Sequence, residues 1–338
     1  MTEAQIIGTQ MTEAAPLRII TTLIPFTHFI EQIGSENVSV TTLVPPGASP
    51  HSYEPKPQQL KALENADLYV SVGSGIEFEL TWMDKLLEVN PDLDVLDCSQ
   101  GIEFIESHEK HKGVEALRQG HKVTETQRHI DGDDDGDDEG DDEGNDDDED
   151  GAVDNIEDND MNIDMDPDHR DNEIGNDPHI WLSPLNAITI ITNIRDKLIS
   201  IDPKHKKQYL INAAAYINTL NSLVTDLTRR FMDLETRSFI VFHPSWAYFA
   251  RDFNLVQIPV EIQGKEPTAK DLAAIITTAK ELGITMIFAS PQFNQKSAEV
   301  IAKEIGGTVV LIDPLAKDYI PNLKRVAQAL QDYSREHD

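Results

Sequence analysis

Three histidines lie in loops whose neighbouring residues favour a fixed position. His51 lies in a proline-rich loop after a predicted strand, His179 precedes a predicted helix, and His243 follows the predicted strand 239–242. Prolines limit the flexibility of such loops, which helps to hold ligand atoms in place before a metal arrives. The other eight histidines have no such surroundings, because five belong to an acidic segment and three to helical or terminal contexts. They are His108, His111, His121, His129 and His169, and His28, His205 and His337.

A carboxylate, Asp313, is the fourth candidate ligand. It follows the predicted strand 308–312, and ligands of open parallel sheets bind at the carboxyl ends of strands, so we expect the four side chains to share one cleft. Three imidazoles and one carboxylate complete a four-coordinate shell that suits Zn²⁺ or a neighbouring transition metal better than Ca²⁺ or Mg²⁺. A single loop histidine is more often a surface residue than a ligand, so spacing alone leaves both interpretations open.

Other residues near these motifs have plainer expected roles. Glu77, Glu261 and Glu266 could orient the histidines, but solvated or helix-capping glutamates are commoner, and that is the role we expect. Trp181 and Trp246 are expected to be packing residues that lie close enough to the ligands to wall the cleft.

The elements that position these residues alternate between strand and helix from residue 18 onward. Near-continuous apolar strands separated by helices indicate βαβ units and a parallel sheet covered on both faces. In the first half we expect strands over 18–24, 38–44, 68–72 and 94–96, and helices over 58–65 and 77–89. In the second half we expect strands over 239–242, 256–260, 285–289 and 308–312, and helices over 245–253, 268–282, 295–305 and 322–333.

Two helices lie between these halves. Ser183-Pro184, a hydroxyl residue followed by proline at the first helical position, opens a helix to about Ile199. A second helix from Pro203 to about Leu234 would be roughly 45 Å long, enough to act as a stiff connector between two lobes. Its apolar stripe comprises Tyr209, Ala213, Tyr216, Leu220, Leu223, Leu227 and Phe231.

The predicted fold class is therefore α/β, with two lobes, each a mainly parallel sheet flanked by helices, joined by one long linker helix. A chain of 338 residues is long enough for two cores. We expect a flexible leader over 1–16, an N-terminal lobe over 17–201, the linker helix over 202–235 and a C-terminal lobe over 236–338. The first lobe contains an acidic insertion at about 106–176, which is almost free of core-forming residues and is expected to be disordered.

Most of the negative charge lies in this insertion. The formal net charge is -33, and residues 131–171 hold 23 acidic residues against one basic residue, which leaves -11 for the rest. Phosphate-backbone binding needs clustered Lys and Arg, so nucleic acid is not an expected partner. The single cysteine, Cys98, excludes a disulfide framework within one chain. The N-terminus lacks the basic and apolar regions of an export signal, which is expected to be absent from this chain.

Four segments resemble the zinc and manganese solute-binding proteins of ABC importers, the ZnuA-like group. The resemblance covers 17 to about 333 apart from the insertion, and it implies metal held between two lobes by residues matching His51, His179, His243 and Asp313. Manganese members tend to carry Glu where this chain has His243, which favours zinc. The segments are Leu43-Val-Pro-Pro-Gly-Ala-Ser-Pro-His51-Ser-Tyr-Glu-Pro-Lys-Pro, Asp177-Pro-His179-Ile-Trp-Leu-Ser-Pro, Phe242-His243-Pro-Ser-Trp-Ala-Tyr-Phe and Leu311-Ile-Asp313-Pro-Leu.

The resemblance implies a carrier that works outside the cytoplasm and delivers Zn²⁺, or alternatively Mn²⁺, to an ABC permease; we expect it to be a monomer. A metal-buffering adhesin-like surface protein is an alternative. A zinc hydrolase is less favoured, because the chain has no His-Glu-x-x-His helix, nucleophile elbow or glycine-rich phosphate loop. We therefore do not expect an enzyme.

Overall fold

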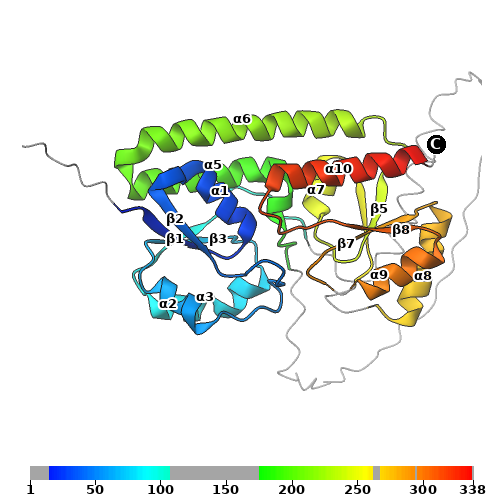
Figure 1. Ribbon diagram of the computed structural model, residues 1–338, viewed down its shortest axis with the longest axis horizontal. Helices are drawn as coiled ribbons and strands as arrows, with labels where there is room; N and C mark the ends of the chain where they lie inside the picture. The colour runs from blue at the N-terminus through cyan, green and yellow to red at the C-terminus, as the bar shows by residue number, and fades with distance from the viewer. Residues whose placement is uncertain (1–14, 107–174, 262–266, 294, 337–338) are drawn as a thin grey trace, which may run out of the picture.

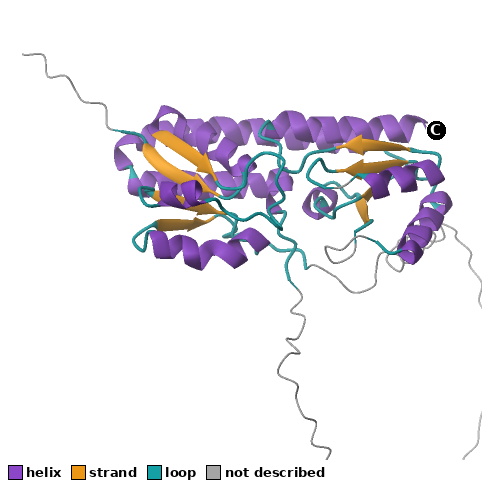
Figure 2. Ribbon diagram, turned by 60° about the horizontal axis from the view of Figure 1, so that its bottom comes forward, coloured by secondary structure: helices purple, strands orange, loops and turns teal. Residues whose placement is uncertain are grey.

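Two parallel four-stranded sheets form the centres of two lobes (Figures 1 and 2), as a computed structural model describes them over residues 15–106, 175–261, 267–293 and 295–336. In the first lobe the strand order is β2-β1-β3-β4, and every neighbouring pair is parallel. These strands are β1 Leu17–Thr21, β2 Val38–Thr42, β3 Leu68–Ser71 and β4 Asp94–Asp97. All four expected strands are present.

The second lobe repeats this arrangement with the order β6-β5-β7-β8, again parallel throughout. Its strands are β5 Ser238–Val241, β6 Val256–Pro259, β7 Met286–Ala289 and β8 Thr308–Leu311. In each sheet the chain crosses over through helices, which lie on both faces (Figure 2). The predicted fold class is confirmed.

Helix α1, Ile24–Gly34, corrects the sequence prediction. The strand expected over 18–24 is too long, because β1 ends at Thr21 and the helix begins three residues later. Pro25 stands in the first helical turn, where its missing N–H breaks no bond and its fixed φ favours the helix. Two further helices of this lobe, α2 Pro57–Leu63 and α3 Glu77–Val89, lie at or within two residues of their predicted positions.

Two antiparallel helices follow the insertion and lead from the first lobe to the second (Figure 1). Helix α5, Pro184–Ile201, is capped by Ser183, whose hydroxyl accepts a hydrogen bond from Asn186 N at 2.9 Å. A short 3₁₀ turn precedes α6, Lys206–Phe231, whose 26 residues give a length of about 39 Å. Its buried side chains are the seven members of the predicted apolar stripe.

Four helices complete the second lobe. They are α7 Ala247–Asp252, α8 Ala269–Glu281, α9 Lys296–Glu304 and α10 Tyr319–Glu336. Helix α10 packs against α6, which also packs against α1 and α5, so the long helix contacts both lobes. Figure 1 shows α6 running along one side of the whole molecule. In the described part of the chain no helix combines the length and apolar character that a membrane crossing requires.

The lobes also meet directly at the segment 177–183, which leads into α5. The indole of Trp181 donates to the carbonyl of Pro314 at 2.8 Å, and the hydroxyl of Tyr319 donates to the carbonyl of Trp181 at 2.8 Å. The hydroxyl of Tyr248, on α7, donates to the carbonyl of Asp177 at 2.8 Å. Three groups of the second lobe therefore fix this segment.

The two ends of the insertion are paired. Glu106 and Asn176 form an isolated antiparallel bridge, and Asp177 N donates to the carbonyl of Ile105 at 2.8 Å. Residues 107–174, which belong to the insertion predicted to be disordered, lie outside the described ranges. Cys98 is buried and unpaired, as expected of a small apolar side chain.

Candidate metal centre

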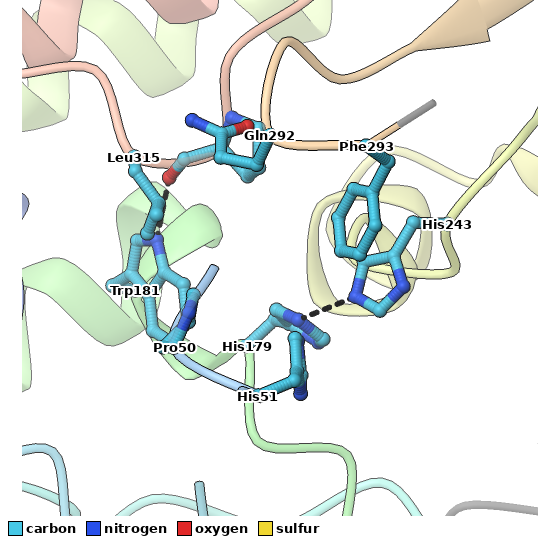
Figure 3. A pocket seen from close by; sticks show the side chains of 9 residues that line it. Pro50, His51, His179, Trp181, His243, Gln292, Phe293 and Leu315 are labelled. Carbon is cyan, nitrogen blue, oxygen red and sulfur yellow. Dashed lines mark hydrogen bonds between the residues drawn. The ribbon is translucent and has the colours of Figure 1, made fainter. Parts of the chain in front are cut away.

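The side chains of His51, His179 and His243 converge where the lobes meet (Figure 3). One ring nitrogen of each lies within 4.8 Å of the others. The Nε2 atoms of His179 and His243 are 3.3 Å apart. Two nitrogens that each lie about 2.05 Å from a tetrahedral zinc ion are separated by roughly 3.3 Å, so this pair already has zinc-like spacing.

Each of these imidazoles contacts a carboxylate through Nδ1. His51 Nδ1 lies 2.6 Å from Glu77 Oε2, and His243 Nδ1 lies 2.7 Å from Glu261 Oε2. His179 Nδ1 lies 2.9 Å from Asp177 Oδ1, which also accepts from His179 N at 2.8 Å. A carboxylate at Nδ1 retains the hydrogen there and leaves the lone pair on Nε2 free to bind a metal.

The Nε2 atoms of His179 and His243 face one another at 3.3 Å. When each ring carries its hydrogen on Nδ1, each Nε2 presents a lone pair to the other. Neither Nε2 carries a hydrogen when both Nδ1 atoms donate to carboxylates, so the contact is repulsive by itself. A cation between the two atoms turns this repulsion into two favourable bonds. The chemistry of the donor set therefore fits a divalent metal.

The carboxylates are the main correction to the sequence prediction of this site. Glu77 and Glu261 were expected to be solvated or capping residues. Glu77 is half exposed in the first turn of α3, as expected, but also contacts His51, whereas Glu261 is buried against His243. Asp177 was not singled out as an orienting residue. The sequence Asp177-Pro-His179 could have indicated this role. The carboxylate of an aspartate two positions before a histidine can accept hydrogen bonds from both the backbone N–H and the ring of that histidine. Glu266 lies outside the described residues.

Burial dominates the electrostatics of His243. Burial is the largest influence and lowers the pKa of this imidazole, the hydrogen bond to Glu261 acts in the opposite direction, and the nearby His179 and His51 lower it; the net result is a pKa of about 4. At neutral pH His243 is therefore unprotonated and ready to bind metal. Partial desolvation raises the pKa of the half-exposed Glu77, but contact with His51 outweighs it and holds that pKa below its usual value.

Local hydrogen bonds hold the loops that carry His51 and His179. Gln59 donates to the carbonyl of Leu43 and accepts from the hydroxyl of Tyr53 at 2.9 Å, which ties both sides of the His51 loop to the start of α2. The hydroxyl of Ser74 donates to the carbonyl of Pro178 at 2.6 Å, next to His179. Both histidines therefore extend into the cluster from restrained backbone.

Aromatic rings wall the site. Phe293 stacks on His243 with ring centroids 4.4 Å apart, and Trp181 lies 5.3 Å from the ring of His179 (Figure 3). Trp181 lines the pocket, as expected. Trp246 does not line it and is instead buried against Phe249, with ring centroids 5.7 Å apart. Phe293 and Trp181 therefore cover the rings of His243 and His179.

Asp313 is the one predicted ligand that the structure does not bring into this cluster. It is not part of the group whose ligand atoms lie within 4.8 Å of one another, and it does not line the pocket. Its Oδ1 accepts hydrogen bonds from Gln292 Nε2 at 2.7 Å and from Leu315 N at 2.8 Å. Among the described residues, the cluster of candidate ligand atoms therefore comprises the three histidines, and the Asp313 carboxylate instead accepts from Gln292 and Leu315.

The sequence places this two-lobed, three-histidine protein among known proteins. The family model of the zinc-uptake complex component A, periplasmic (ZnuA), matches residues 19–333. The chain belongs to this family. The resemblance stated from its four motifs is thereby confirmed.

Individual relatives agree with the family match. The chain is 28% identical over 312 residues to the zinc-binding protein AdcA of Streptococcus pyogenes serotype M3, covering 90% of this chain and 52% of that protein. It thus spans about half the length of the curated relatives it matches. A crystal structure of ZnuA is 38% identical with a TM-score of 0.73, covering 94% of this chain and 99% of that one. A zinc-bound ZnuA deletion mutant is 37% identical with a TM-score of 0.73, covering 94% and 98%.

Proposed function

We propose that this chain is an extracytoplasmic solute-binding protein that captures Zn²⁺ and hands it to the permease of an ABC importer. The observation that carries the proposal is the convergence of three imidazoles, each oriented by its own carboxylate, at the contact between two lobes. Two relatives, the zinc-binding protein AdcA and a zinc-bound ZnuA, support zinc as the cargo, and membership of a family of periplasmic zinc-uptake components supports an extracytoplasmic place of action.

The ligands are His51, His179 and His243, and a zinc titration of single variants tests them. We expect His243→Ala to weaken zinc binding by more than about a hundredfold, because it removes one of three protein ligands. His205→Ala is the matched control, since His205 Nδ1 also contacts a carboxylate, Asp202 Oδ2 at 2.6 Å, but lies outside the cluster. Zinc affinity within twofold of the wild type in His243→Ala would refute the assignment.

Zinc is preferred over Mn²⁺ because all three candidate ligand atoms in the cluster are imidazole nitrogens. Manganese favours carboxylate and water oxygens, and the nearby carboxylates face Nδ1 atoms and not the centre of the cluster. Elemental analysis of protein purified without added metal, followed by competitive titration of Zn²⁺ against Mn²⁺, measures this preference. Tighter binding of Mn²⁺ would reassign the cargo within the family.

The contacts of the acidic residues favour metal transport over a zinc hydrolase activity. With Asp313 outside the cluster, three histidines leave an open metal position such as catalytic zinc has. A hydrolase also needs a general base at that position, whereas Glu77, Asp177 and Glu261 each contact a histidine Nδ1. An adhesin-like buffering role predicts metal binding without transport. Measurement of zinc uptake by cells that lack this protein and its cognate permease distinguishes the transport role from the adhesin-like buffering role.

We propose that the expected domains each supply part of the metal site. The N-terminal lobe over 17–201 supplies His51 and His179, the C-terminal lobe over 236–338 supplies His243, and the linker over 202–235 connects them. We propose that a monomer is the working unit, because all three histidines come from one chain. Light scattering with and without zinc tests this state.

A further inference from the structure

Tyr248 joins the second lobe to the segment that carries His179. Its side chain is buried, and its hydroxyl donates to the carbonyl of Asp177 at 2.8 Å. The same oxygen accepts from Ile105 N at 3.2 Å, and Asp177 N donates to the carbonyl of Ile105. A single hydroxyl of the second lobe therefore holds both strands at the base of the insertion, two residues before the ligand.

Tyr248 also lies close in sequence to the ligand of the second lobe. His243 precedes α7, and Tyr248, five residues later, is the second residue of that helix. Pro244 and a hydrogen bond from Ser245 N to the carbonyl of His243, at 2.9 Å, restrain the turn between them. A short path thus connects the two ligands: it leads from His243 to Tyr248 and across the hydrogen bond of its hydroxyl to the segment of His179.

The other hydrogen bonds between the second lobe and this segment act on its opposite side. They are made by Trp181 and Ser183, which both follow His179. The hydroxyl of Ser74 holds the carbonyl just before His179, but Ser74 belongs to the first lobe and does not set a distance between lobes. In the described part of the chain, Tyr248 is therefore the second-lobe residue that restrains the backbone on the side of the orienting carboxylate.

We propose that Tyr248 is a positioning residue that sets the distance between His179 and His243. The Nε2 atoms of these rings lie 3.3 Å apart (Figure 3). Two facing lone pairs repel one another, so the metal-free protein needs a restraint to keep this spacing. The Tyr248 hydrogen bond supplies that restraint across the contact between lobes, and zinc then binds with less reorganisation. This inference rests on the proposed function and concerns the affinity of that same site.

Tyr248→Phe tests the proposal, because it keeps the buried ring and removes only the hydroxyl. We expect zinc affinity, measured by competition with a chelator, to fall about fivefold, the factor that one hydrogen bond represents. In a His243→Ala background the same change should weaken the residual zinc binding by less than about twofold. The remaining ligands, His51 and His179, both belong to the first lobe, so no distance between lobes has to be kept. General destabilisation of the site would instead cost the same factor in both backgrounds.

Tyr333→Phe is the matched control. The hydroxyl of Tyr333 also bridges two backbone groups, since it donates to the carbonyl of Gly283 at 2.8 Å and accepts from Thr285 N at 3.2 Å. These groups precede β7, at the amino ends of the parallel strands, whereas His243 follows the carboxyl end of β5. Both Phe variants should therefore lower the urea midpoint of unfolding, but only Tyr248→Phe should weaken zinc binding.

Two results would overturn the positioning role. One is zinc affinity of Tyr248→Phe within about twofold of the wild type, at a temperature where circular dichroism shows both proteins folded. The other is an equal loss of affinity in the wild-type and His243→Ala backgrounds. Both results leave the three-histidine site intact, because only a failure of His243→Ala by itself to weaken zinc binding would remove the proposed function.

Discussion

His179 Nε2 and His243 Nε2 lie 3.3 Å apart although 64 residues separate them in the chain. One ring precedes α5 and the other follows β5, and each is held from behind by a different carboxylate. The separation equals that of two nitrogens on a tetrahedral zinc ion. Half of the proposed coordination shell is thus already arranged by contacts that involve no metal.

The carboxylates behind the rings should contribute to affinity without touching the metal. We expect Glu261→Gln and Asp177→Asn each to weaken zinc binding by roughly ten- to a hundredfold, because the ring loses its fixed orientation and some of its basicity. Isothermal titration with a competing chelator measures the change. Asp202→Asn is the control, since it disrupts the off-site pair with His205. Equal losses in all three variants would point to general destabilisation and not to a role at the site.

Zinc should stabilise the folded chain by mass action. A ligand that binds only the folded state adds RT ln(1 + [L]/Kd), about 4 kcal/mol at a thousandfold excess over Kd. We expect a chelator to lower the melting temperature at pH 7.5, and added zinc to restore it. A melting curve that does not respond to zinc or chelator would contradict the metal centre.

Burial of His243 should make the metal-free protein less stable in acid. Its pKa is about 4 in the folded chain against an ordinary 6.5, so the unfolded state binds more protons between these values and the free energy of unfolding falls as pH falls. The lowered pKa corresponds to roughly 3 kcal/mol across the window from about pH 6.5 to about pH 4. Urea unfolding of the wild type and of His243→Gln at pH 7, 5.5 and 4.5 measures it. The difference between the two proteins should change with pH, and a constant difference would show that His243 does not titrate in this way.

The acidic insertion should be dispensable for the tight site. Its ends are already joined by the Glu106–Asn176 bridge, so a short Gly/Ser linker in place of residues 131–171 should not strain the lobe. Zinc affinity should stay within severalfold, while several weak cation sites are lost, because exposed carboxylates bind divalent ions weakly and with poor selectivity. Stoichiometry by equilibrium dialysis and affinity by chelator competition measure both effects.

The insertion also carries a local charge near -22, from 23 acidic residues and one basic residue. This charge should concentrate cations near the cleft, an effect screened beyond about 10 Å at 0.1 M salt. Stopped-flow capture of zinc should therefore slow more at low ionic strength than at high when the segment is replaced. Loss of tight binding would show that the insertion supplies a primary ligand, and unchanged kinetics and stoichiometry would leave only a solubility role.

Local patterns in the sequence determined most of the secondary structure. The seven apolar residues chosen from their spacing are the buried face of α6, and the helix predicted over 77–89 has those limits in α3. Such features depend on periodicity and capping within a few turns, which a single sequence carries. The limits of β1 and α1 were predicted less well, because Leu23 and Ile24 follow Thr21 and Thr22 as further apolar and β-branched residues, a pattern that also suits a strand.

The sequence also nominated His51, His179 and His243, because proline-flanked histidines at the predicted ends of elements are few. Only the tertiary structure decided which carboxylates contact these histidines. Glu77 lies 26 residues from His51 and Glu261 lies 18 residues from His243, and neither separation distinguishes these glutamates from solvated ones. Asp313 has the motif of a ligand, yet its carboxylate lies outside the cluster and accepts from Gln292 and Leu315. Residue type and local spacing limit which groups can bind a metal, but side-chain contacts between distant segments decide which of them face it.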